Sequence, residues 1–233
     1  DRGRRPALTT KVFHSVVGDP GDRGLAPERI RRQLAGSLER LGVDRVELYL
    51  THEPDPHTPL ADTLAELERL RGEGLVGAYG LSNVDAEGLR AARALAPVAA
   101  VQESYSLLDR EAEALLDEGV EFQAFGPLAG GWLTGKYRRG EAAPAGSRMT
   151  LRPEPYRHLD DARIHDALDR FGAEAARRGV DRATLALAWL LSDARVDAVV
   201  VGPRRPDQLE PALRATELPL ADVEREELAA LFA

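Results

Sequence analysis

Short apolar runs alternate with longer stretches of helical period along almost the whole chain. The apolar runs occupy residues 8–13, 46–51, 75–80, 98–102, 121–125 and 197–201. Each is short, and most are rich in Val, Leu or aromatic residues, which is typical of strands buried on both faces. The pattern therefore predicts six buried β-strands.

The stretches between these runs predict helices. Residues 27–41 open with Pro27 and end at Gly42, the residues favoured in the first helical turn and just after the last. Residues 58–71 carry a stripe of leucines at helical spacing, with Thr58 as the candidate N-cap. Further helices are predicted at 85–96, 109–118, 160–178, 181–191 and 206–213, several of them introduced by Asp.

A repeated strand–helix alternation implies parallel strands joined by right-handed crossovers. Two α/β architectures satisfy it, an open doubly wound sheet and a (β/α)8 TIM barrel. An open sheet for a dinucleotide normally shows G-x-G-x-x-G after its first strand, and this chain does not. Its polar residues instead follow the ends of many strands, where barrels place their chemistry. The sequence predicts a (β/α)8 barrel of which strands 3–8 are present, as one domain over residues 1–233.

Composition narrows the class further. The formal net charge of -8 disfavours a nucleic-acid partner. No apolar run approaches the roughly 20 residues that span a bilayer, and residues 1–6 show no secretory signal. The absence of cysteine removes disulfides, thiolate catalysis and thiolate metal sites, and no metal site is expected. A cytoplasmic protein is expected, without a membrane partner.

Polar residues stand at the end of each predicted strand in turn. Taken singly they are unspecific, because a strand lysine often pairs with a carboxylate, a histidine is often a satisfied buried residue, and Ser-Asn is often a turn. Their ordered coincidence carries the weight. The strand ends supply Thr10-Lys11, Thr51-His52, Ser82-Asn83, Gln102, Phe125-Gly126-Pro127-Leu128 and Gly202-Pro203-Arg204-Arg205.

The last strand end is suited to a phosphate. In barrels the last strand loops commonly bind phosphate near a helix N-terminus. Gly202 permits close backbone approach, and Arg204 and Arg205 supply planar guanidinium forks. The alternative is that these are two solvated arginines on a loop.

The ordered motifs resemble the aldo-keto reductase superfamily over nearly the whole chain. The run Pro127-Leu128-Ala129-Gly130-Gly131-Trp132-Leu133-Thr134-Gly135-Lys136-Tyr137 is similar to the aflatoxin-aldehyde-reductase branch. The resemblance implies that the cofactor is NADPH/NADP. It implies that Lys11 lowers the pKa of a proton-donating tyrosine and that His52 hydrogen-bonds the substrate carbonyl. It also implies that Ser82, Asn83 and Gln102 hold the nicotinamide carboxamide and that Phe125 stacks on its ring.

Further cofactor contacts are implied by the same resemblance. Arg204 and Arg205 would hold the 2′-phosphate of NADP, with Arg205 the stronger candidate and Gln208 near the adenosine. The segment of about 126–159, with its many Gly and Pro residues, is expected to be a long loop over cofactor and substrate. Its expected contacts with the cofactor are Gly126, Leu128, Gly130 and Lys136, the last along the pyrophosphate.

The sequence departs from the family pattern at two places. The family's Asp and Tyr precede the position of Lys11, but only ten residues stand before Lys11 here, and they contain no tyrosine. We therefore expect the chain to be a fragment that lacks the first two β/α units, with the proton donor upstream of residue 1 and the fragment alone inactive. Pro211-Ala212 replaces a polar pair that usually contacts adenine.

Three functions are compatible with these observations. The leading hypothesis is an NADP-dependent oxidoreductase that reduces a small aldehyde or ketone by hydride transfer. The second is a non-catalytic NADPH-binding regulatory or partner-binding member of the superfamily. The third is an unrelated phosphate-binding barrel enzyme, which leaves Ser82, Asn83 and Gln102 unexplained. The sequence identifies neither the carbonyl substrate nor the oligomeric state.

Overall fold

The structure, a computed structural model, describes residues 6–16, 18–19 and 21–233. The first five residues of the predicted domain, with residues 17 and 20, lie outside the described part. The chain divides into two compact units. Unit 1 comprises Asp1–Glu103 with Asp117–Glu121, and unit 2 comprises Ser104–Leu116 with Phe122–Ala233.

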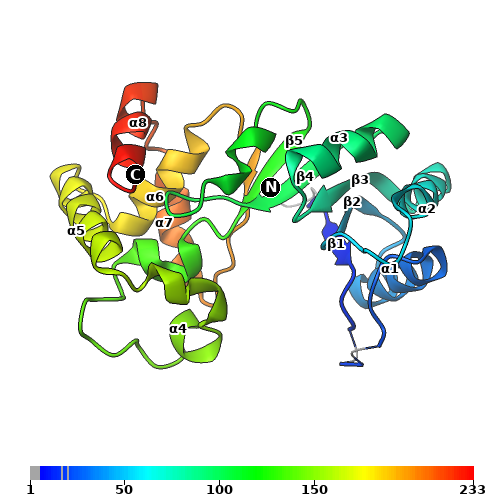
Figure 1. Cartoon of the computed structure of the whole chain (residues 1–233), viewed down its shortest axis with the longest axis horizontal. Coiled ribbons are helices and arrows are strands. Elements are labelled where there is room, and N and C mark those ends of the chain that lie inside the picture. The colour runs from blue at the N-terminus through cyan, green and yellow to red at the C-terminus, as the bar shows by residue number, and fades with distance from the viewer. Residues whose placement is uncertain (1–5, 17, 20) are drawn as a thin grey trace. The chain divides into compact units, whose positions relative to one another are not determined.

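Unit 1 alternates strands and helices as the sequence predicts. Neighbouring strands pair in parallel, β1 with β2, β2 with β3 and β3 with β4. Figure 1 shows the three helices of this unit beside its strands. In chain order the elements are β1 (Thr9–Val12), α1 (Pro27–Leu41), β2 (Val46–Thr51), α2 (Leu60–Gly72), β3 (Val76–Ser82), α3 (Ala86–Leu95) and β4 (Ala100–Ser104).

The strand register decides which side chains share a face of this sheet. Lys11 pairs with Leu50, Leu50 with Gly80, and Gly80 with Ala100. Paired residues of parallel strands project to the same face. Lys11 therefore shares its face of the sheet with Leu50, Gly80 and Ala100, which are small or apolar. Gly80 is required on this face, because a Cβ there would collide with the Ala100 carbonyl oxygen and the Leu50 side chain.

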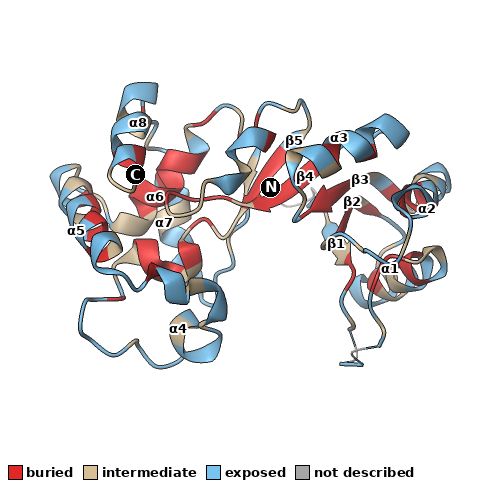
Figure 2. Cartoon of the chain, in the orientation of Figure 1, coloured by how far each residue is buried: buried red, intermediate tan, exposed pale blue. Residues whose placement is uncertain are grey.

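The opposite face packs against the helices. The Tyr49 hydroxyl donates to the Ile30 carbonyl of α1 at 3.2 Å, and the Tyr79 hydroxyl donates to the Glu68 carboxylate of α2 at 2.9 Å. Both rings are fully buried. The Tyr49 side chain thus points toward α1. Figure 2 shows the resulting burial along β2, β3 and β4.

Several helix ends follow the residues predicted to cap them. Pro27 lies in the first turn of α1, Gly42 ends it in the left-handed conformation with φ 64°, and Asp85 caps α3 through the Gly88 N–H. The predicted N-cap Thr58 is wrong. The residue before α2 is Pro59, and the Thr58 hydroxyl donates to Asp55 at 2.8 Å instead.

Unit 2 contains the remaining strands and a set of mostly short helices. Its two strands, β5 and β6, pair in parallel. In chain order its elements are η1 (Glu111–Leu115), β5 (Glu121–Phe125), η2 (Ala129–Thr134), α4 (Arg148–Leu151), η3 (Glu154–Leu159), α5 (Ala162–Arg177), α6 (Arg182–Leu191), β6 (Ala198–Val199), η4 (Pro206–Leu209), α7 (Glu210–Ala215) and α8 (Asp222–Ala230), where η denotes a 3₁₀ helix.

Helix α6 is the centre of unit 2. Every residue from Thr184 to Leu190 is buried, as Figure 2 shows, which explains why this helix is apolar all round. The Trp189 indole N–H donates to the Arg225 carbonyl of α8 at 3.0 Å. The side chains of α6 thus form the core on which the shorter helices pack.

Two predicted helices and one predicted loop differ from the structure. The predicted helix 109–118 is only the 3₁₀ helix η1, because the Asp109 carboxylate accepts from the Ser104 hydroxyl and its backbone pairs with Ser106. The predicted 206–213 is split into η4 and α7. Helix α8 has no counterpart among the predicted helices. The predicted long loop contains η2, α4 and η3.

Candidate functional site

Four strand tips of unit 1 carry the residues predicted to catalyse the reaction and hold the nicotinamide. The Lys11 ammonium donates to the Ser82 hydroxyl at 2.9 Å. That hydroxyl donates to the Gln102 carbonyl at 2.6 Å. Ser82 is fully buried and Gln102 is buried, so the bond between them is shielded from water, whereas the bond from Lys11 is partly buried. The tips of β1, β3 and β4 are therefore joined by one polar network.

Asn83 joins this network to the tip of β2. Its side-chain amide donates to the His52 carbonyl at 2.7 Å and to the Ser82 hydroxyl at 3.4 Å. Its backbone adopts φ 57°, an uncommon conformation for a residue other than glycine. Such strained residues are concentrated at functional sites. All five residues predicted at these tips thus lie at neighbouring strand ends.

Burial and positive charge perturb the titratable groups here. Burial lowers the pKa of Lys11 to about 8, and the Glu103 carboxylate partly opposes that shift. Burial, followed by the positive charges of Lys11 and His14, lowers the pKa of His52, and Glu53 partly opposes it. His52 is therefore predominantly neutral at pH 7, so one imidazole nitrogen can donate and the other can accept.

Two residues that the sequence reading missed stand at the same tips. The His14 and His52 rings meet edge to face with centroids 4.7 Å apart. Buried Glu103 accepts the Val84 N–H at 2.9 Å. Their positions in the sequence could have indicated both residues. His14 follows Lys11 by three residues, and Glu103 directly follows Gln102.

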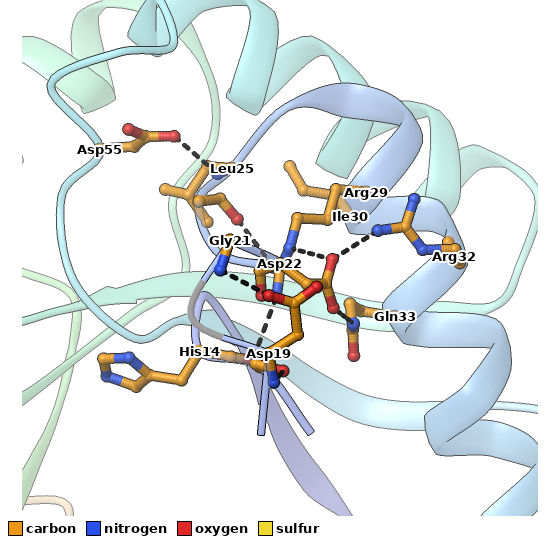
Figure 3. A network of polar contacts seen from close by, with 12 residues as sticks. His14, Asp19, Gly21, Asp22, Leu25, Arg29, Ile30, Arg32, Gln33 and Asp55 are labelled. Carbon is orange, nitrogen blue, oxygen red and sulfur yellow. Dashed lines mark hydrogen bonds and ion pairs between the residues drawn. The ribbon is translucent and has the colours of Figure 1, made fainter. Parts of the chain in front are cut away.

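Buried Arg29 of α1 donates hydrogen bonds to backbone carbonyls of the loop that follows β1 (Figure 3). Arg29, only 5% exposed, donates to the carbonyls of Gly24 at 2.9 Å, His14 at 3.1 Å and Asp22 at 2.6 Å. It also pairs with the Asp22 carboxylate at 3.1 Å. The Gly24 N–H donates to the Phe13 carbonyl at 2.9 Å. These bonds hold His14, Asp22 and Gly24 against α1.

In unit 2, the predicted cofactor residues after β5 lie in a glycine-rich turn. Gly126 and Gly130 have φ 66° and 62°, which glycine adopts at little cost. A Cβ at Gly130 would come within 2.7 Å of the Tyr156 ring. The exposed Lys136 ammonium lies 5.1 Å from the Tyr137 ring centroid. Phe125 and Leu128 flank Gly126 at the start of this turn.

The predicted phosphate residues after β6 already have partners within unit 2. The Gln208 side-chain oxygen accepts the backbone N–H groups of Arg204 at 2.7 Å and Arg205 at 3.3 Å. The Arg204 guanidinium donates to the Gly146 carbonyl at 3.3 Å. Space for a Cβ is open at Gly202. Among described residues, no hydrogen bond or ion pair joins Lys136 to either arginine.

Four of the five tyrosine hydroxyls are bonded elsewhere or lie in the core, whereas Tyr156 is half-buried. Those of Tyr49 and Tyr79 bond to helices, and burial raises the pKa of both well above the ordinary value. The Tyr137 hydroxyl donates to the Gly130 carbonyl at 3.2 Å. Burial raises the pKa of Tyr105 to about 12, and its buried hydroxyl has no partner among the described residues.

Within the described residues, no group of three or more His, Cys, Asp or Glu side chains is placed to hold a metal ion. No helix of the described part combines the length and apolarity needed to cross a bilayer.

These features define an α/β protein whose parallel strands present lysine, histidine, serine and amide groups at their carboxyl ends. The sequence model of the Aldo/keto reductase family matches residues 2–232, and the chain belongs to that family. The predicted superfamily is thereby confirmed.

Similar proteins include reductases and a channel subunit. The chain is 33% identical over 222 residues to the NADH-specific methylglyoxal reductase of Escherichia coli, covering 90% of this chain and 67% of that protein. It is 32% identical over 223 residues to the L-glyceraldehyde 3-phosphate reductase of Escherichia coli, covering 89% and 64%. It is 32% identical over 228 residues to a probable voltage-gated potassium channel subunit beta of Oryza sativa, covering 91% and 68%. The chain thus spans about two thirds of these relatives.

The solved structures agree with the sequence relatives. The glycerol dehydrogenase of Gluconobacter oxydans superposes with a TM-score of 0.84 at 28% identity, covering 97% of this chain and 72% of that one. A thermostable aldo-keto reductase solved with the inhibitor epalrestat gives a TM-score of 0.73 at 27% identity, covering 96% and 70%. The predicted α/β class, of the (β/α)8 barrel type with parallel strands, is confirmed.

Proposed function

We propose that this chain is the major part of an NADPH-dependent reductase that converts small aldehydes or ketones to alcohols. The observation that carries the proposal is the network in which Lys11, Ser82, Asn83 and the carbonyls of His52 and Gln102 are joined at four strand tips. The family membership supports the reaction class, and the names of the methylglyoxal and glyceraldehyde phosphate reductases support a small carbonyl substrate.

The chemistry of these side chains fits a nicotinamide carboxamide. A carboxamide has one acceptor oxygen and two N–H donors, and the Ser82 hydroxyl and the Asn83 and Gln102 amides can both donate and accept. The bound cofactor would supply a hydride. Phe125 would offer an aromatic face for ring stacking.

The other polar groups at these tips would act on the carbonyl oxygen. His52, which is largely neutral at pH 7, would donate a hydrogen bond to that oxygen and orient it. Lys11 would lower the pKa of the tyrosine that gives the proton. That tyrosine, expected upstream of residue 1, remains a prediction.

The proposed NADPH preference rests on the residues after β6 and on the turn after β5. Arg204 and Arg205 would bind the 2′-phosphate, and Gln208 would lie near the adenosine. Gly126, Leu128, Gly130 and Lys136 would follow the cofactor along the loop. The similarity of that loop to the aflatoxin-aldehyde-reductase branch is likewise a proposal.

Cofactor binding tests the proposal directly. We expect NADPH fluorescence to change on titration with the protein, and the Kd to rise roughly tenfold or more in Ser82→Ala, because a buried hydroxyl that orders the site is lost. Leu95→Ala, at an exposed position of α3, is the matched control. A protein that binds neither NADPH nor NADH would refute the proposal.

A second function is favoured by the likeness to the probable channel subunit. In that case the protein would bind NADPH as a regulatory or partner-binding subunit without turnover. Oxidation of NADPH in the presence of methylglyoxal or glyceraldehyde 3-phosphate, abolished in Lys11→Met, would reject this alternative.

A further inference from the structure

The arginine best placed for a 2′-phosphate is paired with a carboxylate of its own loop. The Arg205 guanidinium contacts both oxygens of Asp207 at 3.1 Å. Both side chains are largely exposed, 66% and 63%, so the pair is accessible to a ligand. A fork that holds a carboxylate through two N–H groups uses the donors that it would offer to a phosphate.

The neighbouring groups do not relieve this conflict. The Arg204 guanidinium donates to the Gly146 carbonyl at 3.3 Å, and the backbone N–H groups of Arg204 and Arg205 are taken by Gln208. A phosphate that binds Arg205 must therefore displace Asp207 from Arg205 or share Arg205 with it. In either case the negative charge of Asp207 remains close by. The Arg205 guanidinium lowers the pKa of Asp207, so this charge is present at neutral pH.

We infer that Asp207 is a specificity-determining residue that weakens the binding of NADPH relative to NADH by competing with the 2′-phosphate for Arg205. The inference rests on the proposed function, in which this loop receives the adenosine end of the cofactor. NADH carries a ribose hydroxyl at the 2′ position, which can donate to a carboxylate and brings no charge. Asp207 thus penalises only the phosphorylated cofactor.

The test compares the Kd of both cofactors in matched variants, measured by fluorescence titration without substrate. Asp207→Asn removes the charge and keeps the shape, and we expect its NADPH Kd to fall about three- to tenfold while its NADH Kd changes less than about twofold. Glu210→Gln is the control. It removes an equal charge three residues after Asp207, and the Glu210 carboxylate contacts Arg214 rather than Arg205. We expect the control to alter neither Kd by more than about twofold.

A double-mutant cycle shows whether the effect acts through Arg205. In an Arg205→Gln background, Asp207→Asn should leave the NADPH Kd within about twofold. Equal tightening of NADH and NADPH, no tightening of NADPH, or the same tightening in Glu210→Gln would each overturn the inference while the proposed function stands. Failure of the unaltered protein and all variants to bind either cofactor would instead refute the proposed function, and the inference with it.

Discussion

Replacing Arg29 by Met tests how the segment beside the candidate site is held. Met preserves the aliphatic length of the side chain and removes the guanidinium, which makes three bonds to backbone carbonyls and one to the Asp22 carboxylate. Because Arg29 is 5% exposed, water cannot readily replace these donors. Asp22 is 21% exposed and keeps its pair with Arg32, so the loss comes mainly from the carbonyls left without a donor, and we expect about 1–3 kcal/mol.

The assay is urea unfolding at pH 7, with the free energy of unfolding taken from the midpoint and slope. Arg32→Met is the matched control, because Arg32 is 62% exposed and pairs with the same Asp22 oxygen at 2.6 Å. Exposed pairs are worth about 0–1 kcal/mol. Arg29→Lys keeps the charge but cannot bridge the same carbonyls, so we expect it to recover less than half of the lost stability.

Hydrogen exchange adds a local measurement. The Gly24 amide, bonded to the Phe13 carbonyl, should exchange faster in Arg29→Met and at the ordinary rate in Arg32→Met. A loss below about 1 kcal/mol in Arg29→Met, with an unchanged slope and unchanged exchange at Gly24, would refute the idea that Arg29 organises this segment.

Three further predictions concern other polar groups. Lys11→Met should stabilise the protein at pH 7, because burial disfavours the charged form of Lys11. This gain in stability should shrink as the pH rises above about 8 and vanish above 10.5, the pKa of lysine in the unfolded chain, as thermal unfolding at several pH values would show. A constant gain across that range would contradict the prediction. Asp193→Asn should cost about 3 kcal/mol in urea unfolding at pH 7, because buried Asp193 pairs with Arg195 and Arg225. Burial raises the pKa of Asp193, but the bonds from Arg195 and the charge of Arg225 outweigh burial and lower this pKa to about 2. The stability that the carboxylate contributes should therefore be present above pH 4 and fall as the pH approaches 2. An equal loss of stability in Asp193→Asn at pH 2 and pH 7 would contradict this. Gln208→Ala should change the Kd of NADPH more than that of NADH, because it frees two backbone N–H groups beside Arg205 that a 2′-phosphate can accept from. Equal changes in both Kd values would contradict this prediction.

Local sequence signals determined the elements with strong periodicity and clear end residues. The apolar runs predicted the places of all six strands. The expected burial holds for most residues of β2 to β5, but it is wrong for β1 and β6, whose residues are mainly half-buried or exposed. Pro27 and Gly42 marked α1 because their backbone preferences are intrinsic. The same rules failed at 109–118, where Asp109 bonds to Ser104, a contact that helical spacing does not reveal.

The candidate residues were found from sequence because the ends of parallel strands bring consecutive tips together. What the sequence could not decide was how their polar groups pair. Lys11 and Ser82 are 71 positions apart, and their bond depends on the register of three strands. The pairing of Arg205 with Asp207 rather than with open solvent depends on a loop geometry that Gln208 fixes. Hydrogen bonds and ion pairs are short-ranged and directional, so only the tertiary structure selects among the partners that the sequence offers.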